Sequence, residues 1–111
     1  MLIQRYELRA KDGAQAALQD RLEAMARWLI RRGGCTRVEI LSHIAEPECL
    51  SLVEYWPDEE CRRAAGIAMD RAMLQGIKDA SVSIDQHGLR RHYLAQSRSA
   101  IEQAAGDVEA A

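Results

Sequence analysis

Apolar and polar residues alternate at the start of the chain and then change to a helical spacing. From Leu2 to Arg9 the even positions are more apolar than the odd ones, and this period of two predicts a strand. Gly33 and Gly34 can end a helix, because glycine readily takes the left-handed conformation. Between these segments, over 14–32, apolar residues recur every three or four positions and predict a helix: Leu18, Leu22, Met25, Ala26, Leu29 and Ile30.

Two further alternating runs flank a short polar stretch. The runs Cys35–Ile44 and Cys49–Trp56 enclose residues 45–48, which include a proline. A proline lacks a backbone donor and fits a turn or a sheet edge. This pattern predicts a β-hairpin with a four-residue loop.

A second helix and a last strand are expected after the hairpin. Asp58 is a suitable N-cap residue, and two glutamates follow it in the first turn, where the helix dipole favours negative charge. The apolar stripe runs to about Asp79, and Gly66 is expected to interrupt it. Val82–Leu94 then reads as a long strand, with a bulge expected at Gly88.

The order of these elements predicts the fold class. Strand, helix, strand, strand, helix, strand is the order of an α+β, ferredoxin-like βαββαβ domain, with a four-stranded antiparallel sheet and both helices on one face. We assign this domain to residues 1–94. In the tail, 95–111, Ser99 and Glu102 have capping-box spacing, which predicts a short helix.

The sheet face away from the helices is expected to carry an apolar patch. A loop over 45–48 places Val53 opposite Ile40 and Tyr55 opposite Val38, and we assign these four residues to that face. A bulge would exchange the two faces of the hairpin. An apolar patch of this kind predicts a homodimer through sheet-to-sheet packing.

Composition narrows the class of protein. The 111 residues allow one domain, and 15 Lys and Arg against 17 Asp and Glu give a net charge of −2, which argues against nucleic acid as a partner. No apolar run approaches the ~20 residues of a membrane span, and the first ten residues lack the pattern of a signal peptide. We therefore expect a cytoplasmic protein that does not bind membranes.

The cysteines and histidines do not form a metal site. Cys35, Cys49 and Cys61 are an odd number without CxxC spacing, so we interpret them as small buried hydrophobic residues rather than as disulfide or zinc partners. His87 and His92 lie an odd number of positions apart, which puts them on opposite faces of a strand. No metal, haem or flavin is expected.

One segment resembles a known family. Residues 50–60, Leu-Ser-Leu-Val-Glu-Tyr-Trp-Pro-Asp-Glu-Glu, are similar to the strand and helix start of the antibiotic biosynthesis monooxygenase family, and Gly33-Gly34-Cys35 resembles its Pro-Gly-Cys turn. The resemblance covers about 2–94. It implies a dimeric α+β barrel that oxygenates quinols or polyphenols without flavin or metal, since the substrate itself reduces dioxygen.

The sequence departs from the family at several polar positions. Trp56 matches a Trp that lies in the pocket of polyketide-oxidising members, near an Asn four residues earlier and a Tyr six residues later. Leu52 and Arg62 occupy those two positions here, and the chain has no Asn. Quinol-oxidising and haem-degrading members carry a His on the second helix, whereas residues 62–79 contain none.

Trp56 and Glu54 are the candidate catalytic residues. Trp56 can form a pocket wall that stacks on an aromatic substrate, or it can be a core residue that closes the end of the sheet. Glu54 can be a carboxylate base whose pKa is raised by burial and by a facing Glu39. The alternative for Glu54 is an ion pair with Arg37, diagonally across the hairpin.

The resemblance implies a cofactor-independent monooxygenase acting on a quinol or a polyphenolic, polyketide-like small molecule. The alternative is a non-catalytic, dimeric ligand-binding or regulatory module of the same fold, which the missing Asn and helix His favour. The shape of the space around Trp56 separates these functions, because an enzyme needs a cavity with inward polar groups. We expect the pocket between helices and sheet to be lined by Tyr6, Leu52, Glu54, Trp56, Arg62 and Met69.

Overall fold

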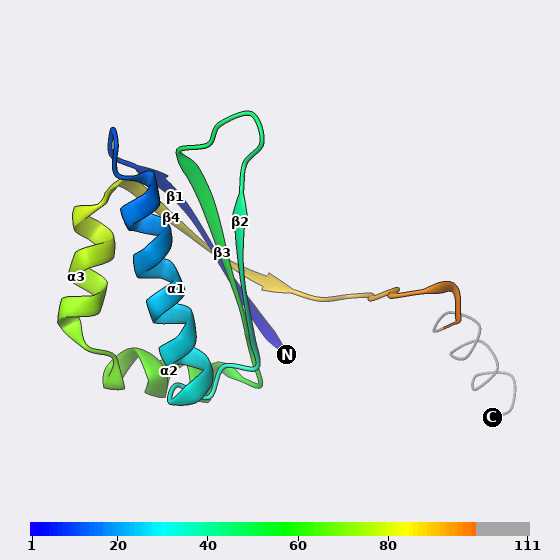
Figure 1. Cartoon of the computed structure of the whole chain (residues 1–111). Helices are drawn as coiled ribbons and strands as arrows, with labels where there is room; N and C mark the ends of the chain where they lie inside the picture. Colours follow the sequence, from blue (N-terminus) through cyan, green and yellow to red (C-terminus); the bar gives the residue numbers. More distant parts are fainter. Residues whose placement is uncertain (100–111) are drawn as a thin grey trace, which may run out of the picture.

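The computed structural model describes residues 1–99, which fold into four strands and three helices (Figure 1). The strands form one sheet in the order β2-β3-β1-β4, with every neighbouring pair antiparallel. The elements in chain order are β1 (Leu2–Ala10), α1 (Gln15–Arg31), β2 (Arg37–Ser42), β3 (Cys49–Trp56), α2 (Glu59–Ala68), α3 (Arg71–Asp79) and β4 (Ser81–Arg90).

All three helices lie on the same side of the sheet, and the other face of the sheet is left uncovered by them (Figure 1). α1 packs on β2 and β3, and α3 packs on β4 and against α1. This arrangement confirms the expected ferredoxin-like α+β fold with its four-stranded antiparallel sheet.

A glycine and two capping aspartates mark the ends of the helices, and the break in the second helical segment lies elsewhere than expected. Gly34 has a φ of 80° where the chain leaves α1, and the Asp58 side chain caps α2 by accepting from Cys61 N at 2.8 Å. The second helical segment breaks at Asp70 and not at Gly66, which lies inside α2. Asp70 accepts from Ala72 N and so starts a new helix, α3.

The hairpin is paired one residue away from the expected register. Its loop holds residues 44–48 rather than four residues, so Ile40 pairs with Leu52 and not with Val53. Because side chains alternate between faces, this shift turns Ile40 and Val38 toward the helices. Val53 stays on the face away from the helices, as expected, but without these two neighbours.

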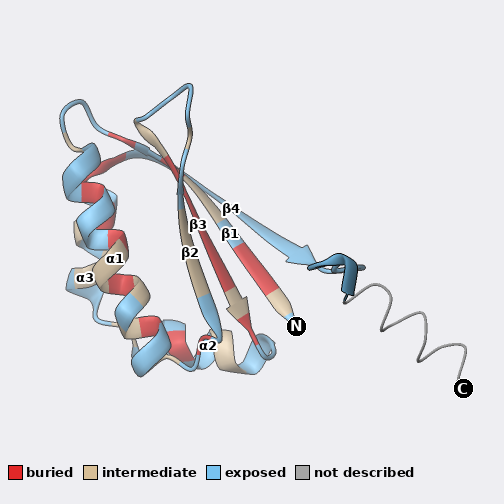
Figure 2. Ribbon diagram, turned by 45° about the vertical axis from the view of Figure 1, so that its right-hand side comes forward, coloured by how far each residue is buried: buried red, intermediate tan, exposed pale blue. Residues whose placement is uncertain are grey.

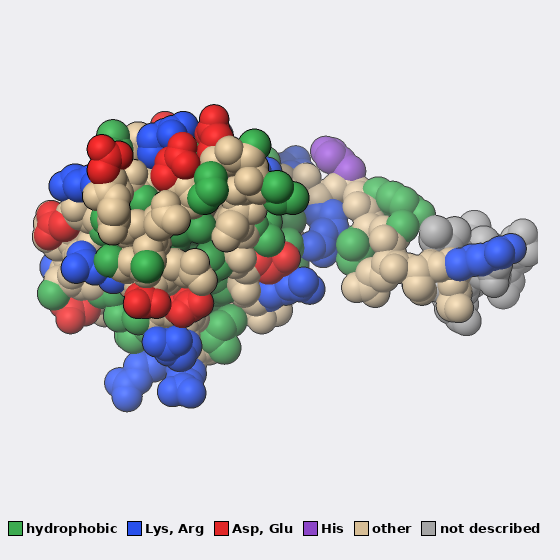
Figure 3. Space-filling view, turned by 45° about the horizontal axis from the view of Figure 1, so that its top comes forward, with side chains coloured by type: hydrophobic (Ala, Val, Ile, Leu, Met, Phe, Trp, Pro, Cys, Tyr) green, Lys and Arg blue, Asp and Glu red, His purple; other side chains and the backbone are tan. Residues whose placement is uncertain are grey.

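The last strand also differs from the sequence pattern. The irregularity in its pairing lies between Arg9 and Ala10 of β1, and Gly88 pairs regularly with Gln4, so the predicted bulge at Gly88 is wrong. β4 ends at Arg90, and the following residues project from the compact body (Figures 1 and 3). Most of the tail, including Glu102 of the predicted capping pair, lies outside the described residues.

The core fills the space between the helices and the sheet, where the buried residues gather in Figure 2. Trp56, Leu18 and Leu22 are among the largest fully buried side chains. All three cysteines are free thiols, but only Cys35 is buried as expected, and Cys49 and Cys61 are half-buried. None of the helices among residues 1–99 is long and apolar enough to cross a membrane.

Candidate functional site

A cavity of about 360 Å³ lies between the sheet and the three helices. Most of its wall consists of Leu, Ile and Met side chains from both layers. Its size falls in the usual range of small-molecule pockets, ~300–1,000 Å³. All six residues that the sequence predicts for a pocket line it: Tyr6, Leu52, Glu54, Trp56, Arg62 and Met69.

The strand period explains why these residues meet. Leu52, Glu54 and Trp56 occupy alternate positions of β3 and therefore point to the same face. Tyr6 of β1 pairs directly with Leu52 and adds a phenol to this row. Arg62 on α2, together with Met69 at the end of that helix, closes the cavity from above the sheet.

Glu54 is a buried carboxylate with one donor and one open oxygen. Its exposed fraction is 4%, and Trp56 Nε1 donates to its Oε1 at 2.9 Å. Burial raises the pKa of Glu54, while the indole hydrogen bond and the charge of Arg62 act in the opposite direction. Glu54 also lines the cavity, and every fully enclosed side-chain oxygen among residues 1–99 has a partner, so the second oxygen of Glu54, for which no hydrogen bond is seen, is not fully enclosed.

Neither of the two expected neighbours acts on Glu54, because the register shift moves both to the other face. The Tyr55 hydroxyl donates to Glu39 at 2.7 Å, and Arg37 Nε lies 3.5 Å from the same carboxylate. The predicted ion pair between Glu54 and Arg37 is therefore wrong. The raised pKa of Glu54 comes from burial and not from Glu39.

Tyr6 and Arg62 supply hydrogen-bond donors to the cavity. Burial, and then the nearby Glu54, raise the pKa of Tyr6 to about 12, so its hydroxyl stays protonated at neutral pH. Arg62 is held by Glu59 through Nε at 3.1 Å and Nη2 at 2.5 Å. Its charge also acts on Tyr6 and Glu54, so a cation lies close to both groups.

The cavity wall also contains residues that the sequence does not predict for it, and some of these lie on α3 and β4. Lys78 of α3 and two residues of β4, Ile84 and Gln86, complete the wall of the cavity. Gln86 pairs directly with Tyr6, which puts its side chain on the same face. The alternation of β4 indicates that Ile84 and Gln86 share a face. Which face this is follows only from the register of β4 against β1.

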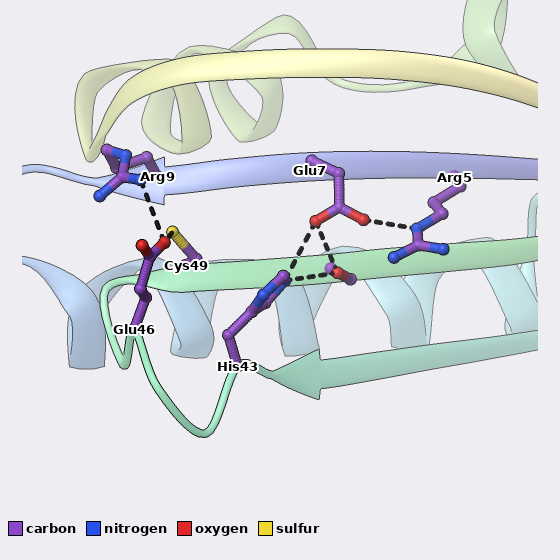
Figure 4. A network of polar contacts seen from close by, with 7 residues as sticks. Arg5, Glu7, Arg9, His43, Glu46 and Cys49 are labelled. Carbon is purple, nitrogen blue, oxygen red and sulfur yellow. Dashed lines mark hydrogen bonds and ion pairs between the residues drawn. The ribbon is translucent and has the colours of Figure 1, made fainter.

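The opposite sheet face carries a polar network near the hairpin loop (Figure 4). Ser51 Oγ donates to Glu7 at 2.7 Å, and His43 Nε2 lies 3.1 Å from each of these two side chains. Arg5 also binds Glu7. These contacts give Glu7, Ser51 and His43 polar partners within one chain.

One group of potential metal ligands occurs among residues 1–99. Glu46, Glu48 and Cys49 place ligand atoms within 4.8 Å of one another at the hairpin loop. Arg9 forms ion pairs with both carboxylates, at 3.3 and 3.0 Å. The guanidinium of Arg9 thus offsets part of the negative charge that would attract a metal ion, and the cluster lies on the face away from the cavity.

Sequence comparison gives a family match over most of the folded core. The model of the family described as "Antibiotic biosynthesis monooxygenase" matches residues 1–65. No curated protein matches the chain.

Solved structures with the same fold include three oxygenase-related proteins. SnoaB, a cofactor-independent oxygenase from Streptomyces nogalater solved as a mutant, superposes with a TM-score of 0.74 at 14% identity, covering 86% of this chain and 97% of that one. A candidate antibiotic biosynthesis monooxygenase from Nitrosomonas europaea gives 0.75 at 16% identity, over 84% and 100%. Another candidate of this kind, from Deinococcus radiodurans, gives 0.72 at 17% identity, over 87% and 98%. At these identities the likeness shows a shared fold.

Proposed function

The chain belongs to the antibiotic biosynthesis monooxygenase family, and on that premise we propose that it is a cofactor-independent monooxygenase acting on a quinol or a polyphenolic, polyketide-like small molecule. The observation that carries this proposal is the mainly apolar cavity with one buried carboxylate, that of Glu54, in its wall. An apolar wall suits a planar ring system, and a few inward polar groups suit its hydroxyls.

Glu54 is the proposed base. A carboxylate whose pKa is raised by burial accepts a proton from a phenol more readily than an ordinary surface carboxylate does. Tyr6 stays protonated and can donate to the phenolate oxygen, and the charge of Arg62 favours that anion. Leu52 and Met69 supply apolar contacts for the ring.

The oxygenation step uses electrons of the substrate. Loss of the phenolic proton makes the ring electron-rich enough to reduce dioxygen. For a ring methylene, one oxygen atom replaces two hydrogens to give a carbonyl, and the other oxygen leaves as water with those hydrogens. This balance needs no flavin or metal, and the protein contributes the base, the anion-stabilising donors and an apolar cavity.

A homodimer through the uncovered sheet face belongs to the same proposal. Ile3, Val53 and Tyr55 lie on this face, since Ile3 pairs with Tyr55 on the side away from the helices. Leu41 and Leu89 share the face and are 46% and 42% exposed. These residues replace Val38 and Ile40 as the apolar part of the interface. The cytoplasmic location stays a prediction.

Oxygen consumption tests the proposed function. A panel of quinols and polyphenols is offered to the wild type in an oxygen electrode, and the best substrate is then given to Glu54→Gln and to Glu60→Gln. Glu60 is exposed on α2 and serves as the matched control. We expect kcat/KM to fall about 100-fold or more in Glu54→Gln alone, because general bases typically contribute ~10²–10⁴-fold.

The same panel distinguishes the non-catalytic alternative. One outcome is that the wild type binds members of the panel, as seen by Trp fluorescence, and yet consumes oxygen with none of them. That result would contradict the monooxygenase proposal and favour a ligand-binding module. Leu52 at the family's Asn position is the feature that favours this alternative.

A further inference from the structure

The Glu54 carboxylate depends on one hydrogen-bond donor. Trp56 Nε1 donates to Oε1 at 2.9 Å, and both side chains are buried. The two residues lie two positions apart on β3, so the strand period aims them at the same cavity. No other donor reaches Glu54 within residues 1–99.

The indole ring itself is nearly closed to a ligand. The exposed fraction of Trp56 is 1%, and its ring belongs to the main apolar cluster of the protein. A stacking wall must offer a ring face to the ligand, and a side chain that is 1% exposed leaves almost no ring surface for this. What Trp56 presents to the cavity chemistry is its N–H.

We propose that Trp56 is a positioning residue whose indole N–H fixes one oxygen of Glu54 and thereby keeps the other oxygen directed into the cavity. This inference rests on the proposed function of Glu54 as the base. Trp56 would then act on the reaction through Glu54, without contacting the reacting atoms.

The surroundings show why this single donor matters. Apolar side chains of α1, among them Leu22 and Met25, face the cavity beside Glu54 and cannot solvate a charge. The titratable groups around the cavity are Tyr6 on β1, Arg62 on α2 and Lys78 on α3. Tyr6 stays protonated, because its pKa is raised to about 12, and therefore carries no charge, and Arg62 is already held by Glu59. The indole N–H is the one direct contact that stabilises the charged form.

Trp56→Phe removes this N–H and keeps an aromatic ring in the core. The ionisation of Glu54 is followed by infrared spectroscopy, through the carbonyl band of its protonated form, which is identified by its loss in Glu54→Gln. We expect the midpoint of the band to move upward by about 1 to 2 pH units, the size of a lost hydrogen bond to a charged group. Trp28→Phe is the matched control, because Trp28 is not part of the cavity wall, and its midpoint should equal that of the wild type.

A measurement on the wild-type chain covers the case in which Trp56→Phe does not fold. The chain has two Trp residues, so a ¹H–¹⁵N spectrum shows two indole signals, and Trp28→Phe assigns them. The Trp56 signal should titrate together with the infrared band and should stop titrating in Glu54→Gln. An indole signal that is independent of Glu54 ionisation, or an unchanged infrared midpoint in a folded Trp56→Phe, would overturn the inference.

Activity provides the third readout. With a quinol substrate, the acid limb of the pH profile of kcat/KM should move upward in Trp56→Phe by the same amount as the infrared midpoint, with activity recovering at higher pH. A uniform loss at all pH values would show a merely structural role and would also overturn the inference. If the band and the indole signal respond as expected while the wild type oxidises no quinol, the positioning role stands and the proposed monooxygenase function fails.

Discussion

The buried carboxylate of Glu54 should destabilise the folded protein at neutral pH, and removing its charge should make the protein more stable. Glu54→Gln keeps the shape of the side chain and an oxygen that can accept from Trp56 Nε1. It removes only the ionisation that burial opposes. The same substitution is expected to abolish the proposed base, so stability and activity should change in opposite directions.

The direction and the pH range of the stability change follow from the linkage between protonation of Glu54 and folding. The folded pKa of Glu54 is raised above its ordinary value of 4.5, so the folded state holds its proton to higher pH than the unfolded state does. The contribution of Glu54 to stability is fully present below about pH 4.5 and is lost as the pH rises through the folded pKa. Each unit of difference between the two pKa values corresponds to about 1.4 kcal/mol.

Urea unfolding of the wild type and Glu54→Gln, measured between pH 4 and pH 8.5, tests this reasoning. The difference in unfolding free energy should be near its minimum at pH 4 and should grow in favour of Glu54→Gln toward pH 8.5. In a domain of this size, 1 kcal/mol shifts Tm by roughly 4 °C, so thermal melts give an independent reading. A difference that is constant over this pH range, or that favours the wild type at pH 8.5, would refute the assignment of Glu54 as a buried group with a raised pKa.

Three further predictions concern other parts of the chain. Val53→Asp should convert the proposed dimer into a 12.4 kDa monomer in light scattering, whereas Ser42→Asp, at the exposed end of β2, should not. Tyr6→Phe should lower kcat/KM for quinol oxidation by roughly 10- to 100-fold at unchanged Tm, because the anion loses a donor; equal activity would remove Tyr6 from the site. Gly34→Ala should reduce the unfolding free energy by about 1 kcal/mol or more in urea titrations, because φ is 80° at this residue.

The fold could be predicted from the sequence because the spacing of apolar residues differs between strands and helices. The alternating runs became β1, β2, β3 and β4, and the three- to four-residue stripe became α1. The limits of β3, Cys49–Trp56, agree with the alternating run itself. Glycine weakens a helix, so the sequence predicts a break at Gly66, but the capping side chain of Asp70 determines where the new helix begins.

The register of the β2–β3 hairpin could not be predicted from the spacing of apolar residues. It depends on whether the loop holds an even or an odd number of residues, and polar residues on both sides of Pro47 allow either. One residue of difference was enough to exchange the faces of Val38 and Glu39. Gln86 was missed for a related reason, since its position follows from the pairing of β4 with β1, which contains an irregularity at Arg9.

The register error does not affect the three cavity residues of β3, because their common face depends on β3 alone. Positions 52, 54 and 56 share a face in any strand, whatever its neighbour, and the burial of Leu52 and Trp56 fixes which face that is. The resemblance places a polar Asn at position 52 in related oxygenases, whereas here the polar group of β3 lies at Glu54, one pleat closer to Trp56. That step brings the carboxylate within hydrogen-bond distance of the indole N–H. A base and the donor that holds it are thus encoded by two alternate residues of one strand, and this part of the site can form without an Asn or a helix His.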